Sequence, residues 1–379
     1  MKKFLGIIAF GALALTACGE AEKQQEASWV VDRFDDIKVL RYEVPGFEEL
    51  TLEEKELIYY LSEAAKCGRD ILWDQNFKYN LAIRRTLESI YTASDVREGE
   101  EFAAFEKYLK KLWFANGIHH HYSNDKFKPE FSEEWFREQL AQYINDENRQ
   151  MDDELLCQII FDPTLYASRL NRSEGVDVIK ASAGNYYEGV SQAEVEAFYT
   201  AMAEADKGNP EPISYGLNSK LMRDTEGNIF ENVWKVGGMY SAAIEQIVFW
   251  LEKAATVANP TQKEIIDALV KYYRSGDLKD FDAYNVLWVK DSASNVDFVN
   301  GFIENYGDPL GHKSSWEAVV NFRDEEACHR TEIMAANAQW FEDNAPINPA
   351  YRKEEVKGVS AKVITVAMLG GDCFPATAL

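Results

Sequence analysis

The chain has 379 residues, 46% of them hydrophobic and 13% aromatic, so it is long enough for two domains and can bury a large core. Its 64 acidic residues exceed its 40 basic ones, and the net charge of −24 argues against nucleic-acid binding, which needs a basic surface. The same acidic excess is common on soluble proteins and is also compatible with a cationic ligand.

The N-terminus has the pattern of a processing signal. Two lysines precede an apolar stretch, Phe4 to Leu15, that is too short to span a bilayer. The following Leu15-Thr16-Ala17-Cys18 resembles a bacterial lipobox. We therefore predict a lipoprotein signal peptide over residues 1–17, then a lipidated Cys18 and a tether over residues 18–35. This would place the protein in the bacterial cell envelope as a membrane-anchored lipoprotein. The alternative is a plain secretory signal in which Cys18 is incidental.

Beyond the tether, helical signals dominate. One strand is expected first, over residues 36–44, where apolar and polar residues alternate before Pro45-Gly46. Capping residues and apolar positions at helical spacing then predict five helices. They start at Thr51–Glu54, near Phe102 (ending at Asn116-Gly117), at Ser132, at Ser191–Glu194 and at Thr261–Glu264 (ending at Ser275-Gly276).

Pieces with strand character lie between these helices and after them. They cover residues 177–180, 186–190, 283–290 and 363–369. One long helix is expected from Trp316 to Phe341, closed by two prolines. Helices mixed with scattered strands indicate an α+β fold rather than a regular βαβ repeat. The last strand leads into a turn and the sequence stops soon after, so we expect a truncated chain.

Common catalytic motifs are absent from the sequence, which contains no HExxH, P-loop, GxSxG or GxGxxG pattern. The triplet His119 to His121 is conspicuous, but adjacent side chains in a loop point apart and seldom share one metal ion. That loop either lines a substrate cleft or is a polar surface loop over a buried Phe127. Cys328 and His329 fall within the expected long helix, where neighbouring side chains diverge by about 100° and cannot form a catalytic dyad.

The four cysteines beyond Cys18 are widely spaced and match no metal-binding pattern. They are Cys67, Cys157, Cys328 and Cys373. Isolated core thiols are the favoured interpretation, and disulfides in an oxidising envelope are the alternative.

The segment from Gly301 to Gly311 holds the most informative pair of side chains. Glu304 and Tyr306 are two residues apart, so on an extended chain they face the same side. A carboxylate there could hold a cationic group, and a phenol could hold a developing oxyanion. By spacing alone, two ordinary loop residues beside a turn remain the stronger alternative.

Several blocks of the chain, from about residue 40 onward, together resemble dipeptidyl peptidase III, a family of zinc aminopeptidases that remove dipeptides. The blocks are Asn116–Pro129, Asn185–Gly189, Tyr215–Leu221, Gly301–Gly311 and Val363–Ala367. The resemblance implies a mainly helical, two-lobed metallopeptidase of which only the N-terminal portion is present. It implies a lower lobe with a small β-barrel core over residues 36–325, an upper-lobe helix over residues 326–358, and a truncated return strand of the barrel over residues 359–379.

The same resemblance implies roles for four residues. Glu304 would bind the N-terminal ammonium group of the peptide, and the hydroxyl of Tyr306 would stabilise the tetrahedral intermediate as a catalytic group. Asn305 would contact substrate through its backbone, and Tyr122 would line the substrate cleft. One departure is Gly307, which stands where many relatives have arginine, so any substrate contact from that side chain is in doubt.

A second departure concerns the metal. The family's HExxGH segment and a later glutamate segment, which supply the zinc ligands and the residue that activates water, are absent from this sequence. We therefore expect no metal ligand in this segment, no activity from it alone, and a zinc site in a full-length protein that continues past Leu379.

The expected function is thus a zinc-dependent dipeptidyl peptidase, represented by its substrate-binding part. Its substrates would be oligopeptides, and the lipid anchor would attach it to a membrane. We expect no binding of nucleic acid and a monomeric protein. The main alternative is a catalytically inactive peptide-binding lipoprotein. A purely structural lipoprotein is a third possibility, in which Glu304→Gln would not change peptide binding.

Overall fold

The computed structural model describes residues 29–357 and 362–371, so Cys18, Cys373 and the signal peptide expected over residues 1–17 lie outside the described residues. The chain divides into two compact units, at Pro45 and Gly46. No helix in the described ranges is long and apolar enough to cross a membrane.

The described part of the first unit is a β-hairpin. Strand β1, Val30–Phe34, pairs antiparallel with β2, Ile37–Leu40, and Asp35 at the turn has φ 51°. The strand expected over residues 36–44 is therefore confirmed in shortened form. Strand β1 overlaps the last part of the tether expected over residues 18–35, and it finds its hydrogen-bonding partner in β2.

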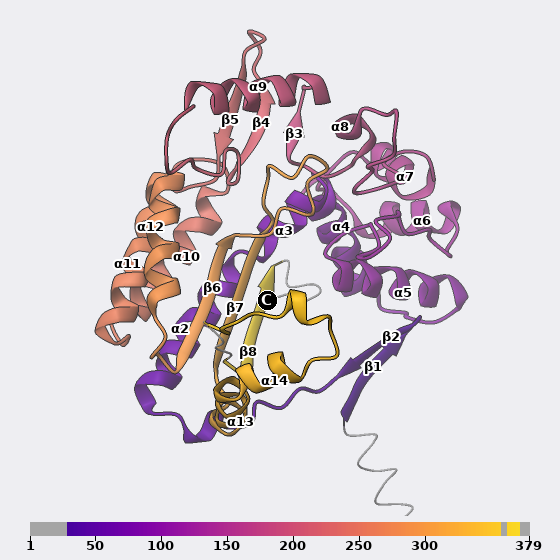
Figure 1. Cartoon of the computed structure of the whole chain (residues 1–379). Helices are drawn as coiled ribbons and strands as arrows, with labels where there is room; N and C mark the ends of the chain where they lie inside the picture. The colour runs from indigo at the N-terminus through magenta and orange to yellow at the C-terminus, as the bar shows by residue number, and fades with distance from the viewer. Residues whose placement is uncertain (1–28, 358–361, 372–379) are drawn as a thin grey trace, which may run out of the picture. The chain divides into compact units, whose positions relative to one another are not determined.

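An antiparallel sheet in the order β6-β7-β8 lies at the centre of the second unit (Figure 1). Its strands are β6 (Val296–Phe302), β7 (Trp316–Arg323) and β8 (Ile364–Gly371), with Val299 opposite Val319 and Val319 opposite Leu369. Strand β8 confirms the expected strand over residues 363–369.

Every residue of β7 except Arg323 is buried. The long helix expected from Trp316 is therefore wrong over its first part, because a central strand buried on both faces does not alternate apolar and polar residues.

Two short helices and a turn follow β7 where one long helix was expected. They are α13 (Glu325–Ala336), α14 (Ala338–Asn344) and the 3-10 turn η2 (Pro349–Tyr351). The side chain of Asp324 accepts a 2.8 Å hydrogen bond from the N–H of Ala327 and so starts α13. Cys328 is a buried residue of α13, and the His329 side chain is 75% exposed, which agrees with helix packing rather than a dyad.

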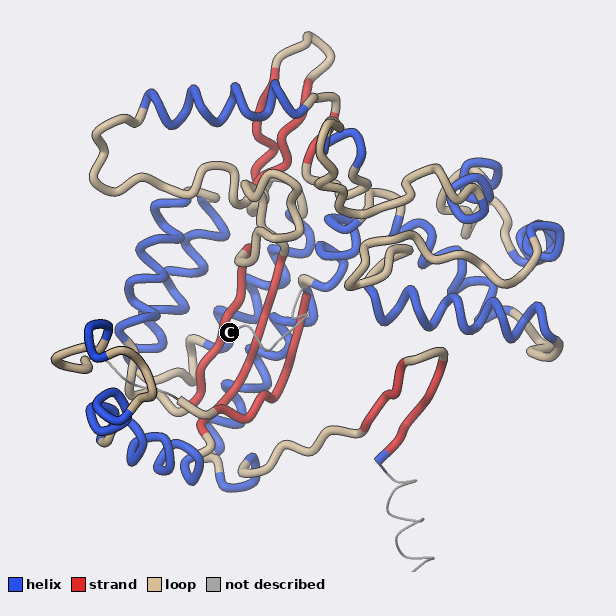
Figure 2. The backbone as a smooth tube through the Cα atoms, turned by 45° about the vertical axis from the view of Figure 1, so that its right-hand side comes forward, coloured by secondary structure: helices blue, strands red, loops and turns tan. Residues whose placement is uncertain are grey.

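Helices pack beside the central sheet (Figure 2). The group consists of α2 (Leu52–Cys67), α3 (Arg69–Asn76), α10 (Ser241–Ala254), α11 (Pro260–Ser275) and α12 (Leu278–Lys290). Helix α2 contacts α10 and all three strands of the sheet. The capping box at Thr51 is confirmed, since its hydroxyl accepts from the N–H of Glu54 at 3.2 Å and the Glu54 carboxylate accepts from the N–H of Thr51 at 2.9 Å.

Two predictions within this group are wrong. The capping box at Thr261 does not form, because Asn259 caps α11 by accepting a 2.9 Å hydrogen bond from the N–H of Gln262, and Pro260 occupies the first turn. The predicted end of that helix is confirmed, with Gly276 in the left-handed conformation. Residues 283–290 are helical rather than extended, since Asp277 caps α12 and the helix packs on α11.

A second helical group forms a hydrophobic core of its own. Its helices are α4 (Asn80–Ala93), α5 (Glu100–Ala115), α6 (Glu133–Tyr143) and α7 (Asp153–Phe161), and Phe105, Leu112, Phe136 and Leu156 are fully buried among them. The helix expected near Phe102 is confirmed, as is its end at Asn116, which has φ 53°. The cap at Ser132 is confirmed by its 3.3 Å hydrogen bond from the N–H of Trp135.

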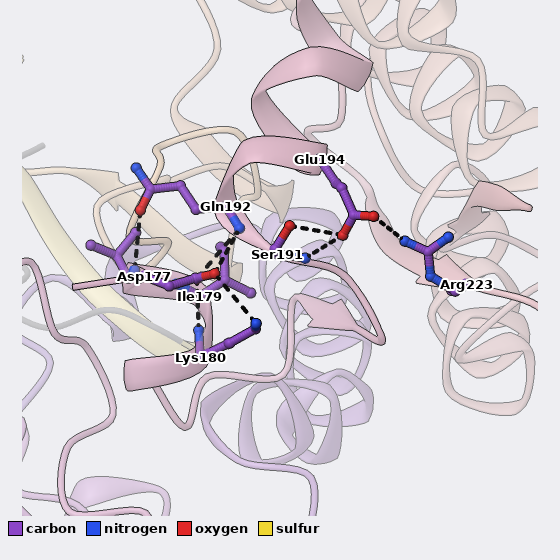
Figure 3. Close-up of polar contacts among 8 residues, drawn as sticks. Asp177, Ile179, Lys180, Ser191, Gln192, Glu194 and Arg223 are labelled. Atoms are coloured by element: carbon purple, nitrogen blue, oxygen red, sulfur yellow. Dashed lines mark hydrogen bonds and ion pairs between the residues drawn. The ribbon is translucent and has the colours of Figure 1, made fainter. Parts of the chain in front are cut away.

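A third group joins two helices to a small mixed sheet. It contains α8 (Val178–Ala181), α9 (Gln192–Ala205), β3 (Tyr187–Glu188), β4 (Ser219–Arg223) and β5 (Ile229–Val233), with β3 parallel and β5 antiparallel to β4. Residues 177–180 are a helical turn rather than a strand, because Asp177 caps it by accepting from Ile179 and Lys180 at 3.1 Å (Figure 3). The strand expected over residues 186–190 is confirmed in short form as β3.

The capping box of α9 joins the helix to the sheet. The Glu194 carboxylate accepts from the N–H of Ser191 at 2.9 Å and also receives a 2.5 Å hydrogen bond from Arg223 of β4 (Figure 3). These N–H and hydroxyl donors from Ser191, followed by Arg223, lower the pKa of Glu194 to about 2.

The α+β class predicted from the sequence is confirmed. Among the described residues the strands form separate two- and three-stranded sheets, and none of these is a closed barrel. The three described cysteines, Cys67, Cys157 and Cys328, are free thiols, as favoured above. The lobe boundaries expected at residues 325 and 358 stay predictions.

Candidate functional site

The loop that carries Glu304 and Tyr306 connects β6 to β7. Its first residues continue the strand pairing: the N–H of Ile303 donates to the carbonyl of Ser315 at 3.1 Å, and the N–H of Ser315 donates to the carbonyl of Glu304 at 2.9 Å. Glu304 is half-buried, and Tyr306 begins a turn with 41% of its surface exposed. The backbone is therefore extended as far as Glu304 and turns after Asn305.

A buried carboxylate holds the turn. Asp308 is fully buried, and its Oδ2 accepts hydrogen bonds from the hydroxyl of Tyr187 (2.7 Å) and from the N–H groups of His312 (2.7 Å) and Lys313 (2.9 Å). Burial first, and then the charge of Asp308, raise the pKa of Tyr187 far above its ordinary value. The Tyr187 hydroxyl therefore stays protonated and acts as a donor throughout the physiological range.

Two further side chains fix the loop. Nη2 of Arg172 donates to the carbonyl oxygens of Tyr306 (3.0 Å) and Asp308 (2.7 Å). Nδ2 of Asn305 donates to the carbonyl of Gly311 at 2.8 Å, and the Asn305 carbonyl accepts from the N–H of Asp308 at 3.2 Å. The carbonyl of Asn305 is thus used within the turn, which restricts the backbone contact with substrate that the resemblance implied for this residue.

Tyr122 and Tyr306, predicted from distant parts of the sequence, line the same cavity. Its volume is about 250 Å³, and Gly307 and Arg169 also contribute to its wall. Asn305 instead lines a second cavity of about 440 Å³, together with Tyr199 and His312. Glu304 is absent from both linings. The structure therefore brings two of the four predicted substrate-contacting residues together and places Glu304 and Asn305 beside them in the same loop.

The histidine triplet has divided roles. His121 lines the same cavity as Tyr122, and Phe127 is buried, so the loop both borders the cavity and covers an apolar residue. His119 is buried, with Nε2 lying 2.8 Å from the carbonyl oxygen of Tyr166. Burial first, and then the positive charges of Arg169 and Lys126, lower the pKa of His119 to about 4.

The donor groups do not suit a metal ion. Nδ1 of His120 accepts from the N–H groups of Tyr122 (3.1 Å) and Ser123 (3.2 Å), and Nε2 of His119 is engaged by Tyr166. Within residues 29–357 and 362–371 there is no group of three histidine, cysteine, aspartate or glutamate side chains placed to hold a metal ion. The described residues therefore do not fit the zinc that the family resemblance implies.

Other side chains at the site were missed by sequence reasoning. Asp308 and Arg172 shape the Tyr306 loop, and Arg169 lines the cavity. Lys126 lies at the other end of the histidine loop and donates to the carbonyl oxygens of Ile159 (2.8 Å), Leu165 (2.6 Å) and Asp162 near the end of α7. Asp308 lies within the segment from Gly301 to Gly311 but belongs to no recognisable motif, and no spacing in the sequence connects the two arginines to the loop.

Comparisons with known proteins find similarity chiefly to one peptidase family. The model of "Peptidase family M49" matches residues 192–376. Rattus norvegicus "Dipeptidyl peptidase 3" is 28% identical over 171 residues, 44% of this chain and 23% of that protein. The Dictyostelium discoideum protein of the same name is 22% identical over 359 residues, 86% of this chain and 50% of that protein.

A solved structure shares the fold. The structure of DPP III from Caldithrix abyssi matches with a TM-score of 0.58 and 18% sequence identity, and the match covers 87% of this chain and 51% of that chain. The chain thus spans half or less of the length of the curated relatives named above and about half of this structure.

Proposed function

Because the chain belongs to the dipeptidyl peptidase III family, peptidase family M49, we propose that it is the peptide-binding part of a dipeptidyl peptidase. Such an enzyme releases dipeptides from the N-terminus of oligopeptides. The observation that supports this proposal most directly is the cavity that Tyr122 and Tyr306 line together, beside the loop that carries Glu304. Two aromatic side chains flanking one cavity suit the binding of one side chain of a short peptide.

We propose one role for each predicted residue. The carboxylate of Glu304 binds the N-terminal ammonium group of the peptide, since a charge-assisted hydrogen bond at a half-buried position is strong. The hydroxyl of Tyr306 donates to the oxyanion that forms on the scissile carbonyl, a contribution of roughly 3 kcal/mol for one donor in a site that excludes water. Tyr122 packs against the substrate, and Asn305 keeps the loop in shape through Gly311.

The hydrolytic step requires groups that the described residues do not supply. Because their donor atoms do not fit a metal ion, we derive no step through zinc and assign these residues to binding and orientation of the peptide. By itself, the chain would then bind peptide without cutting it. We further propose that Cys18 carries a lipid anchor that places the protein in a bacterial envelope, as the lipobox pattern indicates.

The amine-binding role can be tested with matched peptides. Isothermal titration of the full chain would compare Ala-Gln-Ala-Ala with its N-acetylated form, which has no ammonium group. We expect the free peptide to bind about 10-fold more tightly or better, because hydrogen bonds to charged groups contribute about 1.5–3 kcal/mol. Glu304→Gln would remove that difference, and Glu226→Gln, an exposed carboxylate in the β4–β5 turn, would keep it. Equal binding of the two peptides to the unaltered chain would contradict the role of Glu304.

The same preparation separates hydrolysis from binding alone. Zinc content would be measured together with release of a dipeptidyl chromophore. Peptide binding without zinc and without turnover supports a binding chain, either as the substrate-binding part of an enzyme or as an inactive peptide-binding lipoprotein. Turnover by the purified chain would contradict the assignment of these residues to binding only.

A further inference from the structure

The cavity lined by Tyr122 and Tyr306 carries a positive charge inside an acidic protein. Among the described residues that line it, Arg169 is the arginine and no aspartate or glutamate is present. The remaining polar side chains include Asn76, Asn116 and Asn124, which are neutral. The described lining therefore contains no carboxylate side chain, although the whole chain has a net charge of −24.

Arg169 is held in one orientation. Its Nε donates to Oδ1 of Asn124 at 3.0 Å, and its Nη1 donates to Oδ1 of Asn76 at 2.9 Å. Nδ2 of Asn76 in turn donates to the carbonyl of Asn116 at 3.1 Å, which turns the Asn76 oxygen toward the arginine. Because two amide oxygens fix the plane of the guanidinium, little conformational entropy would be lost when it binds a ligand.

The backbone of Arg169 is fixed as well. Its N–H donates to the carbonyl of Asn124 at 2.8 Å, and its carbonyl accepts from the N–H of Gly184 at 3.1 Å. Arg169 therefore lies between two neighbouring segments, and the cavity wall that it forms is rigid.

The charge of Arg169 is not neutralised by an acidic side chain in the described part of the chain. Its side-chain hydrogen bonds go to amide oxygens, which accept hydrogen bonds without cancelling the charge. Other arginines of this protein differ: Arg84 pairs with Asp70 at 2.9 Å and Arg223 with Glu194 at 2.5 Å. The two N–H groups of Nη2 and one N–H group of Nη1 make no hydrogen bond to these asparagines. A carboxylate can accept two hydrogen bonds from such a pair of guanidinium nitrogens.

We propose that Arg169 makes this cavity a subsite for the carboxylate side chain of an aspartate or glutamate in a bound peptide. This inference rests on the proposed function, in which a peptide binds with its amine at Glu304 and its backbone near Tyr306. The cavity, at about 250 Å³, has room for one side chain. Because Tyr306 lines it and lies two residues from the amine-binding Glu304, the acidic residue is one of the first two of the peptide. The protein would then prefer peptides with an acidic residue at its N-terminal end, despite its own negative charge.

Peptide pairs that differ only in charge would test the preference. Titration calorimetry on the full chain would compare Ala-Glu-Ala-Ala with Ala-Gln-Ala-Ala, and Glu-Ala-Ala-Ala with Gln-Ala-Ala-Ala. The acidic member of at least one pair should bind about 10-fold more tightly or better. Arg169→Gln should abolish that difference and leave the affinity for the glutamine peptides within about 2-fold. Arg149→Gln, an exposed arginine paired with Asp153, is the matched control and should keep the preference.

The possible outcomes are distinct. If glutamine peptides bind but acidic peptides bind no better to the unaltered chain, the inference is overturned and the proposed function stands. If neither kind of peptide binds, the proposed function fails and the inference fails with it. If amidation of the peptide C-terminus weakens both members of a pair and the acidic member binds no better than its partner, Arg169 binds the terminal carboxylate and the side-chain assignment is overturned. The comparison of acidic and glutamine peptides uses only the unaltered chain. It therefore tests the inference even if Arg169→Gln does not fold.

Discussion

The hydroxyl of Tyr187 donates a 2.7 Å hydrogen bond to Oδ2 of Asp308, the same oxygen that accepts the N–H groups of His312 and Lys313. Tyr187 belongs to β3, and Asp308 belongs to the loop between β6 and β7. The contact therefore connects the small mixed sheet to the loop that carries Tyr306. The position of the candidate catalytic hydroxyl depends on a carboxylate two residues away that is itself fully buried.

Asp308→Asn should destabilise the chain by about 2–4 kcal/mol, because the neutral amide loses the charge that strengthens these hydrogen bonds. Its nitrogen must also face either the donors at Oδ2 or the N–H of Leu310 at Oδ1. Urea unfolding followed by far-ultraviolet circular dichroism would measure the loss. The matched control is Asp267→Asn, an exposed residue of α11 paired with Lys263, which should change stability by less than about 0.5 kcal/mol. A variant at Asp308 as stable as this control would contradict the structural role of the carboxylate.

His119 should make stability depend on pH between about 4 and 6.5. The pKa of His119 is lowered to about 4 in the folded chain, chiefly by burial, against an ordinary value of 6.5. Between these values the unfolded chain binds a proton that the folded chain does not, so stability falls as the pH falls. From pH 7.5 to pH 5, this histidine should cost about 2 kcal/mol.

A comparison of variants isolates this effect from other titrating groups. His119→Gln keeps a donor for the carbonyl of Tyr166 but does not titrate, so the stability of the unaltered chain should drop relative to this variant as the pH is lowered. Chemical denaturation at several pH values would measure the difference. A difference that stays constant from pH 7.5 to pH 5 would show that His119 titrates normally.

Local sequence signals predicted the helices whose caps are unambiguous. Thr51 and Ser132 start helices as expected, since each side chain accepts a hydrogen bond from an N–H three residues on. The box at Thr261 failed because Asn259 and Pro260 form a competing start two residues earlier. A capping pattern therefore identifies a helix more reliably than it identifies the first residue.

Strand β7 and helix α12 are elements whose type was predicted wrongly from the sequence. Strand β7 reads Trp-Glu-Ala-Val-Val-Asn-Phe-Arg, and burial of both faces removed the alternation that would have identified it. The opposite error occurred in α12, where Tyr284 and other aromatic and branched residues suggested a strand, although the helix is capped by Asp277 and packs on α11. In both places tertiary contacts outweighed local preference.

The candidate site was predictable only where a known family pattern reached it. Tyr122 and Tyr306 were named from that resemblance, and the structure places them in one cavity. Arg169 could not be named, because its position depends on Asn76 and Asn124, which lie far from it in sequence. Such a contact exists only after the chain has folded, so no spacing within the sequence predicts it.

Lys126 should be one of the most important lysines for stability. Its ammonium group donates to three carbonyl oxygens, those of Ile159, Asp162 and Leu165, around the end of α7. Carbonyl groups at a helix end lack partners within the helix, so a cation there is favourable. Lys126→Met should therefore cost about 2–4 kcal/mol in denaturant unfolding, because it leaves these oxygens without a donor.

Its neighbour in sequence provides the control for that experiment. Lys128 is exposed, so Lys128→Met removes the same charge without disturbing buried carbonyl groups. We expect a change below about 0.5 kcal/mol for this variant. Similar losses for Lys126→Met and Lys128→Met would mean that net charge, rather than the carbonyl contacts of Lys126, sets the effect.

Gly68 should tolerate no side chain, for reasons of space rather than backbone conformation. It has φ −85°, which any residue can adopt, but a Cβ atom there would lie 2.1 Å from the ring of Trp316. Trp316 is fully buried and forms the start of β7, so it cannot move aside without disturbing the sheet. Gly68→Ala should therefore cost about 3 kcal/mol or more in urea unfolding.

Gly175→Ala is the control with the opposite constraint, because Gly175 has φ +80° and no atom lies within 4 Å of the new Cβ. It should cost only about 1 kcal/mol, from backbone strain. If Gly68→Ala costs no more than this control, the close approach of α2 and α3 to Trp316 is looser than the structure indicates.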